Sequence, residues 1–292
     1  MSAVISAIIV NYNAGELLRS CVDSLLNCPL EIEIIVLDNA STDGSLDALL
    51  GLTCVQIIKN PVNVGFAAAC NSGARVASAQ FLLFLNPDCF FKQGTLARLL
   101  EAVLVDDRVG MAGGCLTNLD GTEQAGGRRA VPTPWRSFVH AFGLVRFSDR
   151  WPRLFFNFHL HKQPLPDHNI EVEAISGACM LVKRVAMADV GPWDEGYFLH
   201  CEDLDWCMRF RQKGWKILFV PSARVTHALG VSSRSRPIFV EWHKHKGMTR
   251  FYRKFFRHQY PGVLMGFVAL GVWLRFGFVV GYYTVKRIIG RG

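Results

Sequence analysis

Residues 33–45 of the sequence read EIIVLDNASTDGS, a short apolar run that ends at Asp38 and is followed by turn-forming residues. An apolar run of this length, bounded by turn residues, is typical of a buried strand. Similar runs occupy residues 6–11, 55–58 and 81–85, and segments with helical periodicity occupy residues 16–26, 66–77 and 95–104. Strands that alternate with helices predict an α/β fold with a Rossmann-like, mixed but mainly parallel sheet flanked by helices.

Ligands of such sheets bind beyond the carboxyl ends of the strands, so the polar residues that follow each strand are candidate site residues. Asn11 and Asn13 follow the first strand, and Asp38 and Asn39 follow the second. A carboxylate followed by Ser, Thr and Gly is suited to holding a base or a ribose. The same residue types also form ordinary turns and helix caps, and the sequence leaves both interpretations open.

The fourth strand is followed by Asn86-Pro87-Asp88, which places a carboxylate where it can meet a metal ion that bridges a diphosphate. His227 follows a strand expected at residues 215–220, and its neutral imidazole can complete the shell of Mg²⁺ or Mn²⁺. Either residue alone fits an ordinary structural role equally well. Asn63-Val64-Gly65 precedes a helix whose first N–H groups can face phosphate. The sequence lacks complete dinucleotide-binding and P-loop patterns, which disfavours hydride transfer and P-loop chemistry.

The densest acidic cluster lies between Trp193 and Trp206, where five acidic residues fall within twelve positions. Acids that are interleaved with aromatic residues are costly to bury without partners or a task. The adjacent Glu202 and Asp203 can supply a general base, because like charge and partial burial raise the pKa of one of them. The alternative is simple complementarity to the dipole of a helix that begins there.

The charges of the chain are unevenly distributed. Its 292 residues are 50% hydrophobic and 19% charged, which excludes a disordered chain. Residues 1–233 carry 20 basic and 23 acidic side chains, whereas residues 234–292 carry 12 basic ones and a single acid, Glu241. A basic tail on a near-neutral body favours attachment to a membrane surface over nucleic-acid binding. We therefore expect a catalytic domain over residues 1–233, with halves at 1–117 and 118–233, and a helical extension over residues 234–292.

Two helices are expected in the extension. Residues 241–257 place aromatic side chains at helical spacing opposite a basic face, which favours the surface of an anionic bilayer; packing on the catalytic domain is the alternative. Residues 260–285 are long and apolar enough to span a bilayer, but Arg275 and a stripe of glycines favour an in-plane or oligomer-buried helix. Membrane association and a homo-oligomer are both compatible with this pattern. Residues 118–170, by contrast, show no clean period and predict an irregular, substrate-facing excursion.

The order of these motifs is familiar. The segments 8–13, 36–45 and 63–67, together with a block that runs from Gly177 to Trp206, resemble family 2 glycosyltransferases of the GT-A fold. The likeness covers about residues 4–257. It is greatest to the rhamnosyltransferase-like members that extend lipid-linked bacterial glycans.

The resemblance implies a role for each candidate residue. Asp38 is the implied contact of the nucleotide base, and Asp203, paired with Glu202, is the implied catalytic base. Asp88 matches the last acid of the family's DxD metal motif, whose first acid is here replaced by an amide, and His227 matches a further ligand of Mg²⁺ or Mn²⁺. The rest of the implied nucleotide-sugar site comprises Asn11, Asn13, Asn39, Asn63, Gly65 and Asn86. The implied acceptor site comprises Trp193, Asp194 and Trp206.

The resemblance also implies a reaction. A sugar, with L-rhamnose from dTDP-rhamnose as the first candidate, is transferred with inversion from a nucleotide-diphosphosugar to a polyprenyl-diphosphate-linked glycan. The implied setting is cell-surface polysaccharide or lipopolysaccharide synthesis at the cytoplasmic face of the inner membrane. Nine scattered cysteines without a CxxC pair fit that reducing compartment. A UDP-sugar donor, a nucleotidyltransferase and a non-enzymatic binding module remain as alternatives.

Overall fold

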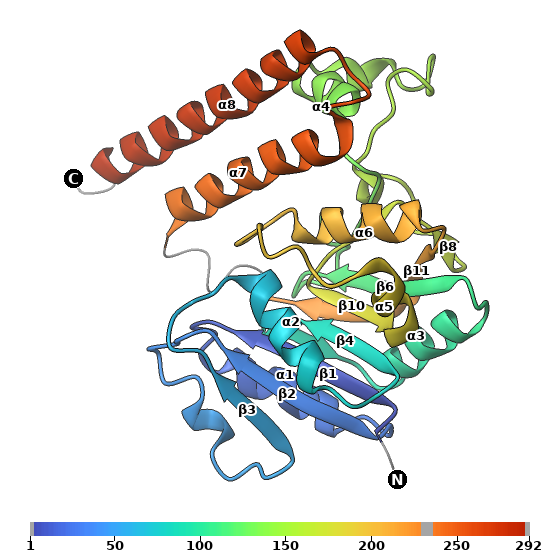
Figure 1. The fold of residues 1–292 in the computed structure, drawn as a ribbon, viewed down its shortest axis with the longest axis vertical. Helices are drawn as coiled ribbons and strands as arrows, with labels where there is room; N and C mark the ends of the chain where they lie inside the picture. The colour runs from blue at the N-terminus through green and yellow to red at the C-terminus, as the bar shows by residue number, and fades with distance from the viewer. Residues whose placement is uncertain (1–2, 229–235, 290–292) are drawn as a thin grey trace.

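The computed structural model describes residues 3–228 and 236–289. Its centre is a nine-stranded sheet with the order β3-β2-β1-β4-β10-β6-β11-β5, and β8 pairs with β11 beside this path (Figure 1). Six of these strands run in one direction, so the predicted mixed, mainly parallel sheet is confirmed. The strands are β1 Ile5–Asn11, β2 Ile32–Asp38, β3 Val55–Lys59, β4 Phe81–Leu85, β5 Cys89–Phe91, β6 Val109–Thr117, β8 Ile170–Glu171, β10 Cys179–Lys183 and β11 Lys216–His227.

Helices cover both faces of the sheet. Side chains at alternate positions of β1 and β2 point to opposite faces, as the pleat of a strand requires, and so feed two separate cores. One core packs against α1 Leu17–Leu26, η1 Asp47–Leu49 and α3 Thr95–Leu104. The other core packs against α2 Phe66–Val76, α5 Arg184–Val190 and α6 Glu202–Gln212.

Two central strands, β6 and β10, were not foreseen from the sequence. β6 contains Gly113 and Gly114, and a Cβ atom on Gly114 would lie 2.3 Å from the backbone oxygen of Ala223. Gly114 permits β11 to approach closely and Gly113 leaves room for the side chain of Ile175, but both glycines weaken the apolar pattern by which a strand is recognised. β11 also runs further than the expected strand at 215–220, because its pairing with β6 shifts register between Val220 and Arg224 and then resumes.

The expected irregular excursion at 118–170 is partly regular. It contains the helix α4 Pro134–Ala141, whose N-cap Thr133 accepts a hydrogen bond from the N–H of Arg136. The excursion also contains β7 Arg128–Arg129, which pairs with β9 Ala174–Ile175, and the short helices η2 Leu144–Phe147 and η3 Leu160–Lys162. The capped start of α4 is a helix signal that the surrounding irregular sequence obscures.

The first C-terminal helix, α7 Pro237–Phe256, packs on the α/β domain. Phe251, Tyr252 and Phe256 are buried in the same core as α6, so the expectation that this aromatic face lies on a bilayer is wrong. Its basic side chains explain the docking, because Arg250 and Lys254 form ion pairs with Asp194 at 2.9 and 2.7 Å. The alternative that the sequence left open, packing on the protein, is the one that the structure contains.

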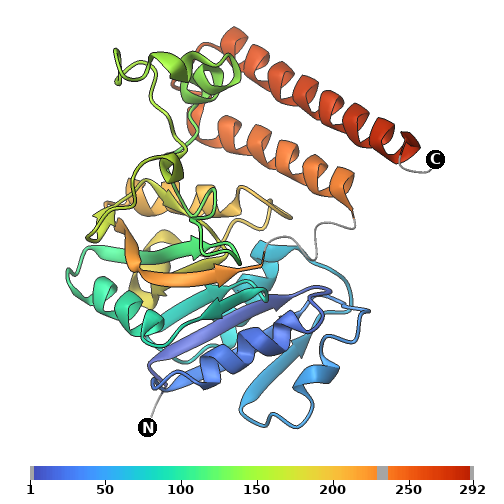
Figure 2. The ribbon, with the colours of Figure 1, turned by 180° about the vertical axis from the view of Figure 1, so that it is seen from behind.

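The second C-terminal helix, α8 Gly262–Ile289, lies beyond α7 and packs mainly against it (Figure 2). Trp242 of α7 contacts Trp273 and Phe276 of α8, with ring centroids 5.1 and 5.6 Å apart. Residues 262–287 have a mean hydropathy of 2.1, and the protein buries none of the most apolar window. By length and composition α8 can therefore cross a membrane.

Candidate active site

The ends of β1 and β2 form one hydrogen-bonded group. The side-chain amide of Asn11 donates to Asp38 Oδ1 at 2.8 Å and approaches the hydroxyls of Ser41 and Ser45 at 3.1 and 2.8 Å. Asp38 Oδ2 also accepts the backbone N–H of Ser41. Asn11 and Asp38 are almost completely buried, yet Asn11 Oδ1 has no hydrogen-bond partner within the described ranges. The group is thus rigid and keeps one acceptor free for a ligand.

The remaining amides at this edge shape the neighbouring loops. Asn13 Oδ1 accepts the N–H of Thr42, and Asn63 Oδ1 accepts the N–H of Gly65 at 2.9 Å. The side-chain amide of Asn39 donates to the carbonyl oxygen of Gly65 at 3.2 Å. These contacts bring together residues predicted for nucleotide-sugar binding. The side-chain amides of Asn13, Asn39 and Asn63 already form hydrogen bonds that fix the loops.

Gly65 occupies a position that no other residue fits without strain. Its φ is +87°, in the region that favours glycine, and an added Cβ would lie 2.7 Å from the backbone oxygen of Phe198. The N–H of Phe66 donates to that same oxygen at 3.0 Å. The loop before α2 therefore lies directly against the loop that leads into α6.

Asp88 and His227 form the candidate metal centre. β5 and β11 pair His227 with Cys89, which brings His227 Nε2 to 3.2 Å from Asp88 Oδ1. The other ring nitrogen, Nδ1, lies 2.6 Å from Gln124 Oε1. When Nδ1–H donates to Gln124, Nε2 presents a lone pair beside the carboxylate, which is the usual arrangement of a metal-binding histidine.

The neighbouring groups refine this centre. The thiol of Cys89 lies within 4.8 Å of both ligands, but it already donates to the carbonyl oxygen of Ala178 at 3.3 Å. The side-chain amide of Asn86 lies 3.4 Å from His227 Nε2. One carboxylate, one imidazole and a nearby amide match the nitrogen and oxygen ligands that Mg²⁺ and Mn²⁺ accept, so these residues fit such an ion.

Glu202 and Asp203 begin α6 after a strained turn. His200 and Cys201 both have positive φ, +68° and +72°. The carboxylate of Asp203 forms an ion pair with Arg129 of β7 and accepts the N–H of Gly177 at 3.2 Å. These contacts fix the orientation of the Asp203 carboxylate at the start of the helix. The strained turn before the helix is thus part of the structure that presents this carboxylate.

Glu202 differs from its neighbour. It is buried, and its Oε2 has no hydrogen-bond partner in the part of the chain that the structure describes. Burial, and next the charge of Asp203, raise the pKa of the Glu202 carboxyl. The pair therefore consists of one carboxylate held by an arginine and one carboxyl that resists ionisation.

A chain of contacts joins the metal centre to the catalytic pair. β10 runs antiparallel to β4, and the carbonyl oxygen of Ala178, just before β10, accepts the N–H of Asn86 at 2.9 Å. The adjacent Gly177 donates to Asp203. Asp38 lies at the end of β2, two strands from β4 in the same parallel set. Asp38, Asp88 and Asp203 thus lie along one edge of the sheet.

Two of the residues predicted for acceptor binding are buried. Trp193 and Trp206 are only 2% and 0% exposed, and their ring centroids lie 4.1 Å apart beside Phe84. Both indoles form part of the core beneath the site, and their contact with an acceptor stays a prediction. The two tryptophans at the ends of the acidic cluster pack in this core.

Asp194 belongs to the docking of α7. Burial alone would raise the pKa of its carboxyl, but hydrogen bonds from Lys254, Gly196 and Arg250 lower that pKa to about 2. Asp194 therefore anchors the C-terminal helix, and its contact with an acceptor stays a prediction. Asp205, fully buried, extends the anchor, since it pairs with Lys254 at 2.6 Å and with Arg209 at 2.8 Å.

Two further residues of the site were missed, Arg129 and Gln124. Both come from the segment that was expected to be irregular. Arg129 follows two glycines and another arginine, a basic pair that could have been noted, but its contact with Asp203 spans 74 positions. Nothing local in the sequence marks Gln124 as the partner of His227.

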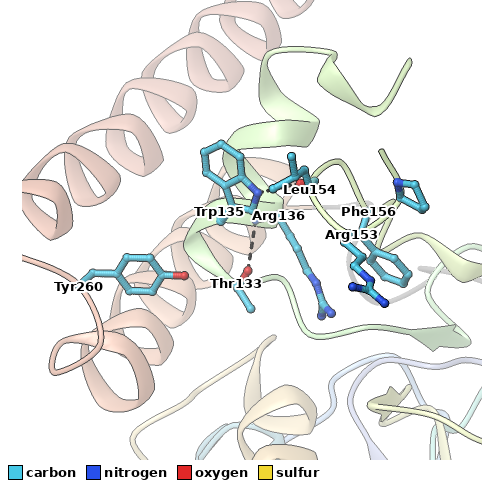
Figure 3. A pocket seen from close by; sticks show the side chains of 8 residues that line it. Thr133, Trp135, Arg136, Arg153, Leu154, Phe156 and Tyr260 are labelled. Atoms are coloured by element: carbon cyan, nitrogen blue, oxygen red, sulfur yellow. Dashed lines mark hydrogen bonds between the residues drawn. The ribbon is translucent and has the colours of Figure 1, made fainter. Parts of the chain in front are cut away.

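A cavity of about 620 Å³ lies between α4, residues 152–156 and Tyr260 (Figure 3). In Figure 3 Trp135, Arg136 and Arg153 face this space from the excursion, and Tyr260 faces it from the connection between α7 and α8. The cavity is lined by none of the residues at the strand ends. It lies on the α8 side of the molecule.

Solved structures define the class of this fold. The chain is similar to GalNAc-T7 with UDP, GalNAc and Mn²⁺, with a TM-score of 0.61 at 19% identity over 86% of this chain and 48% of that one. It is also similar to a mannosyltransferase from Pyrobaculum calidifontis in complex with GDP-Man and Mn²⁺, with a TM-score of 0.58 at 16% identity over 87% and 64%. The predicted GT-A type fold is confirmed.

The sequence comparison then gives the family. The profile of glycosyl transferase family 2 matches residues 6–189, and the chain belongs to that family. N-acetylglucosaminyl-diphospho-decaprenol L-rhamnosyltransferase of Mycobacterium tuberculosis is 29% identical over 78% of this chain and 76% of its own length. Rhamnosyltransferase WbbL of Escherichia coli is 25% identical over 55% and 57%. The enzyme is a glycosyltransferase with rhamnosyltransferase-like relatives.

Proposed function

We propose that this enzyme transfers a sugar, with inversion, from a nucleotide-diphosphosugar to a polyprenyl-diphosphate-linked glycan at the cytoplasmic face of the membrane. L-Rhamnose from dTDP-rhamnose is the first candidate donor, because two of its relatives are named as rhamnosyltransferases. The observation that carries the proposal is the chain of contacts joining Asp88 and His227 to Asp203 along one edge of the sheet.

The group around Asp38 holds the nucleoside. Its carboxylate and the free Oδ1 of Asn11 are acceptors, and they suit the N–H groups of a base or the hydroxyls of a sugar ring. Because Ser41 and Ser45 already fix both side chains, little ordering is required when the nucleotide binds.

Asp88 and His227 hold Mg²⁺ or Mn²⁺ in this proposal. When bound there, the ion offsets the negative charge that develops on the nucleoside diphosphate as it leaves. Gln124 keeps the imidazole in the tautomer that faces Asp88. With an amide at Asn86 in place of an acid, the site keeps a single firm carboxylate ligand.

Asp203 accepts the proton of the acceptor hydroxyl while that oxygen attacks the anomeric carbon. Arg129 and the N–H of Gly177 orient its carboxylate, which has lone pairs enough to accept a further hydrogen bond from substrate. One displacement inverts the anomeric centre and requires no enzyme nucleophile. Glu202, which resists ionisation, acts as a positioning residue behind this base.

The apolar helix α8 attaches the enzyme to the membrane. It presents large apolar side chains such as Phe267, Phe278 and Tyr282 to the solvent, and Lys286 and Arg287 lie in its last turn. An apolar surface of this extent requires a partner, and basic residues beside it favour an anionic leaflet. A lipid-linked acceptor would then reach the site from the same surface.

A panel of nucleotide sugars tests the proposal. The full chain in detergent, with Mn²⁺ and a farnesyl-diphospho-N-acetylglucosamine acceptor, is expected to use dTDP-L-rhamnose and to release dTDP. The anomeric configuration of the product, read by NMR, should be opposite to that of the donor. A preference for a UDP-sugar would show that the donor is that sugar nucleotide and not dTDP-L-rhamnose. Retention of configuration, or release of inorganic diphosphate, would contradict the proposed reaction.

A further inference from the structure

Three histidines gather beside the catalytic pair. His140 belongs to α4, and His159 and His161 lie at η3; the ring of His159 is 4.6 Å from that of His140 and 5.6 Å from that of His161, between centroids. Lys162 follows directly. We call His140, His159, His161 and Lys162 the histidine cluster.

Backbone contacts hold this cluster against β7. The N–H of Ala130 donates to the carbonyl oxygen of Phe158 at 3.1 Å, and the guanidinium of Arg128 donates to the carbonyl oxygen of Gln163 at 2.9 Å. Arg129, between these two anchors, is therefore next to the cluster on one side and paired with Asp203 on the other.

The cluster offers hydrogen-bond donors, and two cations, Lys162 and Arg129, lie within or beside it. Burial lowers the pKa of His159 to about 4, and the charged groups that lower it further are all basic: His140, His161, Lys162 and Arg129. Arg129 Nε and His161 Nδ1 are buried and have no hydrogen-bond partner among the residues described. Neutral imidazoles can donate hydrogen bonds, and together with Lys162 and Arg129 they suit an anionic ligand.

The far side of the cluster faces α8. After burial, the charges of Lys162 and Arg275 lower the pKa of His140, so Arg275 of the apolar helix lies close to α4. The order in space is Asp203, Arg129, the histidine cluster and then α8. A lipid-linked acceptor has the same order of parts, namely a sugar hydroxyl, a diphosphate and an apolar chain.

We propose that the histidine cluster and Arg129 bind the diphosphate of the lipid-linked acceptor, so that its sugar reaches Asp203 while its chain follows α8. This subsite rests on the proposed function and deepens it by assigning the acceptor's anionic group to named residues. The donor diphosphate belongs instead to the metal centre of Asp88 and His227, which comes from other strands.

A double variant tests the subsite. His159→Gln with Lys162→Ala is expected to raise the KM for farnesyl-diphospho-N-acetylglucosamine at least about tenfold, since hydrogen bonds to a charged group are lost. The kcat, the KM for donor and the slow transfer to octyl N-acetylglucosaminide, which lacks a diphosphate, should not change. Inorganic pyrophosphate should compete with the lipid acceptor in the parent enzyme and about tenfold more weakly in the variant.

A matched control removes the same two residue types elsewhere. His168→Gln with Lys92→Ala changes two exposed side chains, and its kinetics should equal those of the parent. An unchanged acceptor KM in the cluster variant overturns the subsite. A raised donor KM with an unchanged acceptor KM also overturns it, because the cluster would then bind the nucleotide.

Failure of the proposed function would look different. If the parent enzyme transfers no sugar to the diphospho-acceptor with any donor, the reaction itself is wrong. Calorimetric titration with inorganic pyrophosphate then still decides the subsite: binding that the cluster variant loses supports it, and equal binding by both proteins, or none by either, overturns it.

Discussion

The surfaces proposed for the two substrates differ in character. On the donor side, the strand ends carry Asp38, Asp88 and neutral amides, and their polar groups are mostly engaged with one another. On the proposed acceptor side, Arg129 and Lys162 are cationic and lie beside neutral imidazoles, and the buried Arg129 Nε and His161 Nδ1 lack partners among the described residues. One side is acidic and preorganised, whereas the other is basic and incomplete.

This difference matters because both proposed substrates carry a diphosphate. An acidic donor side repels a diphosphate unless a cation intervenes, so the proposed function expects Asp88 and His227 to hold a divalent ion for the donor to bind well. The acceptor side supplies its own cations from side chains. We therefore expect donor binding to depend on the metal ion and acceptor binding to depend on basic side chains.

The largest effect is expected at Asp203. Asp203→Asn keeps the shape of the side chain but removes its basicity, so transfer should fall roughly a hundred- to ten-thousand-fold. Donor binding, measured by calorimetry with Mn²⁺, should stay close to that of the parent. The control is Asp189→Asn, since Asp189 pairs with Lys213 on the surface. Parent-like transfer by Asp203→Asn would remove this residue as the base.

The next effect concerns the support of the metal centre. Gln124→Leu removes the acceptor that fixes His227, and the loss of such a partner lowers metal affinity by about 10- to 100-fold. The Mn²⁺ concentration that gives half-maximal donor binding should rise accordingly, whereas acceptor binding should not. Gln93→Ala, on an exposed loop, is the control. An unchanged Mn²⁺ requirement in Gln124→Leu would show that Gln124 does not support metal binding.

A smaller effect is expected where α7 is anchored. Lys254→Ala removes the ammonium shared by Asp194 and the fully buried Asp205. Asp205 keeps Arg209, so we expect a loss of about 1–3 kcal/mol in the free energy of unfolding. Urea denaturation measures this, with Lys246→Ala on the exposed side of the same helix as the control. Equal stability of the two variants would show that the ion pairs do not dock α7.

The smallest effect is a pH dependence of stability at Glu202. Its pKa in the folded protein is raised above the ordinary value of 4.5, so ionisation opposes folding. That cost is absent at pH below 4.5 and grows as pH rises above it. Glu202→Gln removes the cost and should raise Tm relative to the parent at pH 8, with little difference at pH 4.5. A difference that does not change with pH would exclude a raised pKa at this carboxyl.

The donor half could be predicted from sequence because its signals are local. The helix at 95–104 and the strand at 81–85 have the predicted bounds, since apolar periodicity and flanking turns define each one separately. Asp38 and Asp88 were found by the rule that ligands bind beyond the strand ends. Their placement on one edge follows from the parallel order of β2, β1 and β4.

The acceptor half could not be predicted in the same way because it depends on contacts between distant residues. The acids between Trp193 and Trp206 suggested a general base, but their separate partners, Arg129 for Asp203 and Lys254 for Asp194, lie on segments far along the chain. The aromatic face of α7 has the same pattern whether it packs on protein or on lipid. Only the fold shows that Phe251 is buried.

The central claim is that the two diphosphates are held by different means, and binding with and without metal tests it most directly. Calorimetry would compare dTDP and farnesyl-diphospho-N-acetylglucosamine in Mn²⁺ and then in EDTA. We predict that EDTA weakens dTDP binding at least about tenfold and leaves acceptor binding essentially unchanged. Equal loss of both affinities, or no loss of either, would contradict the account.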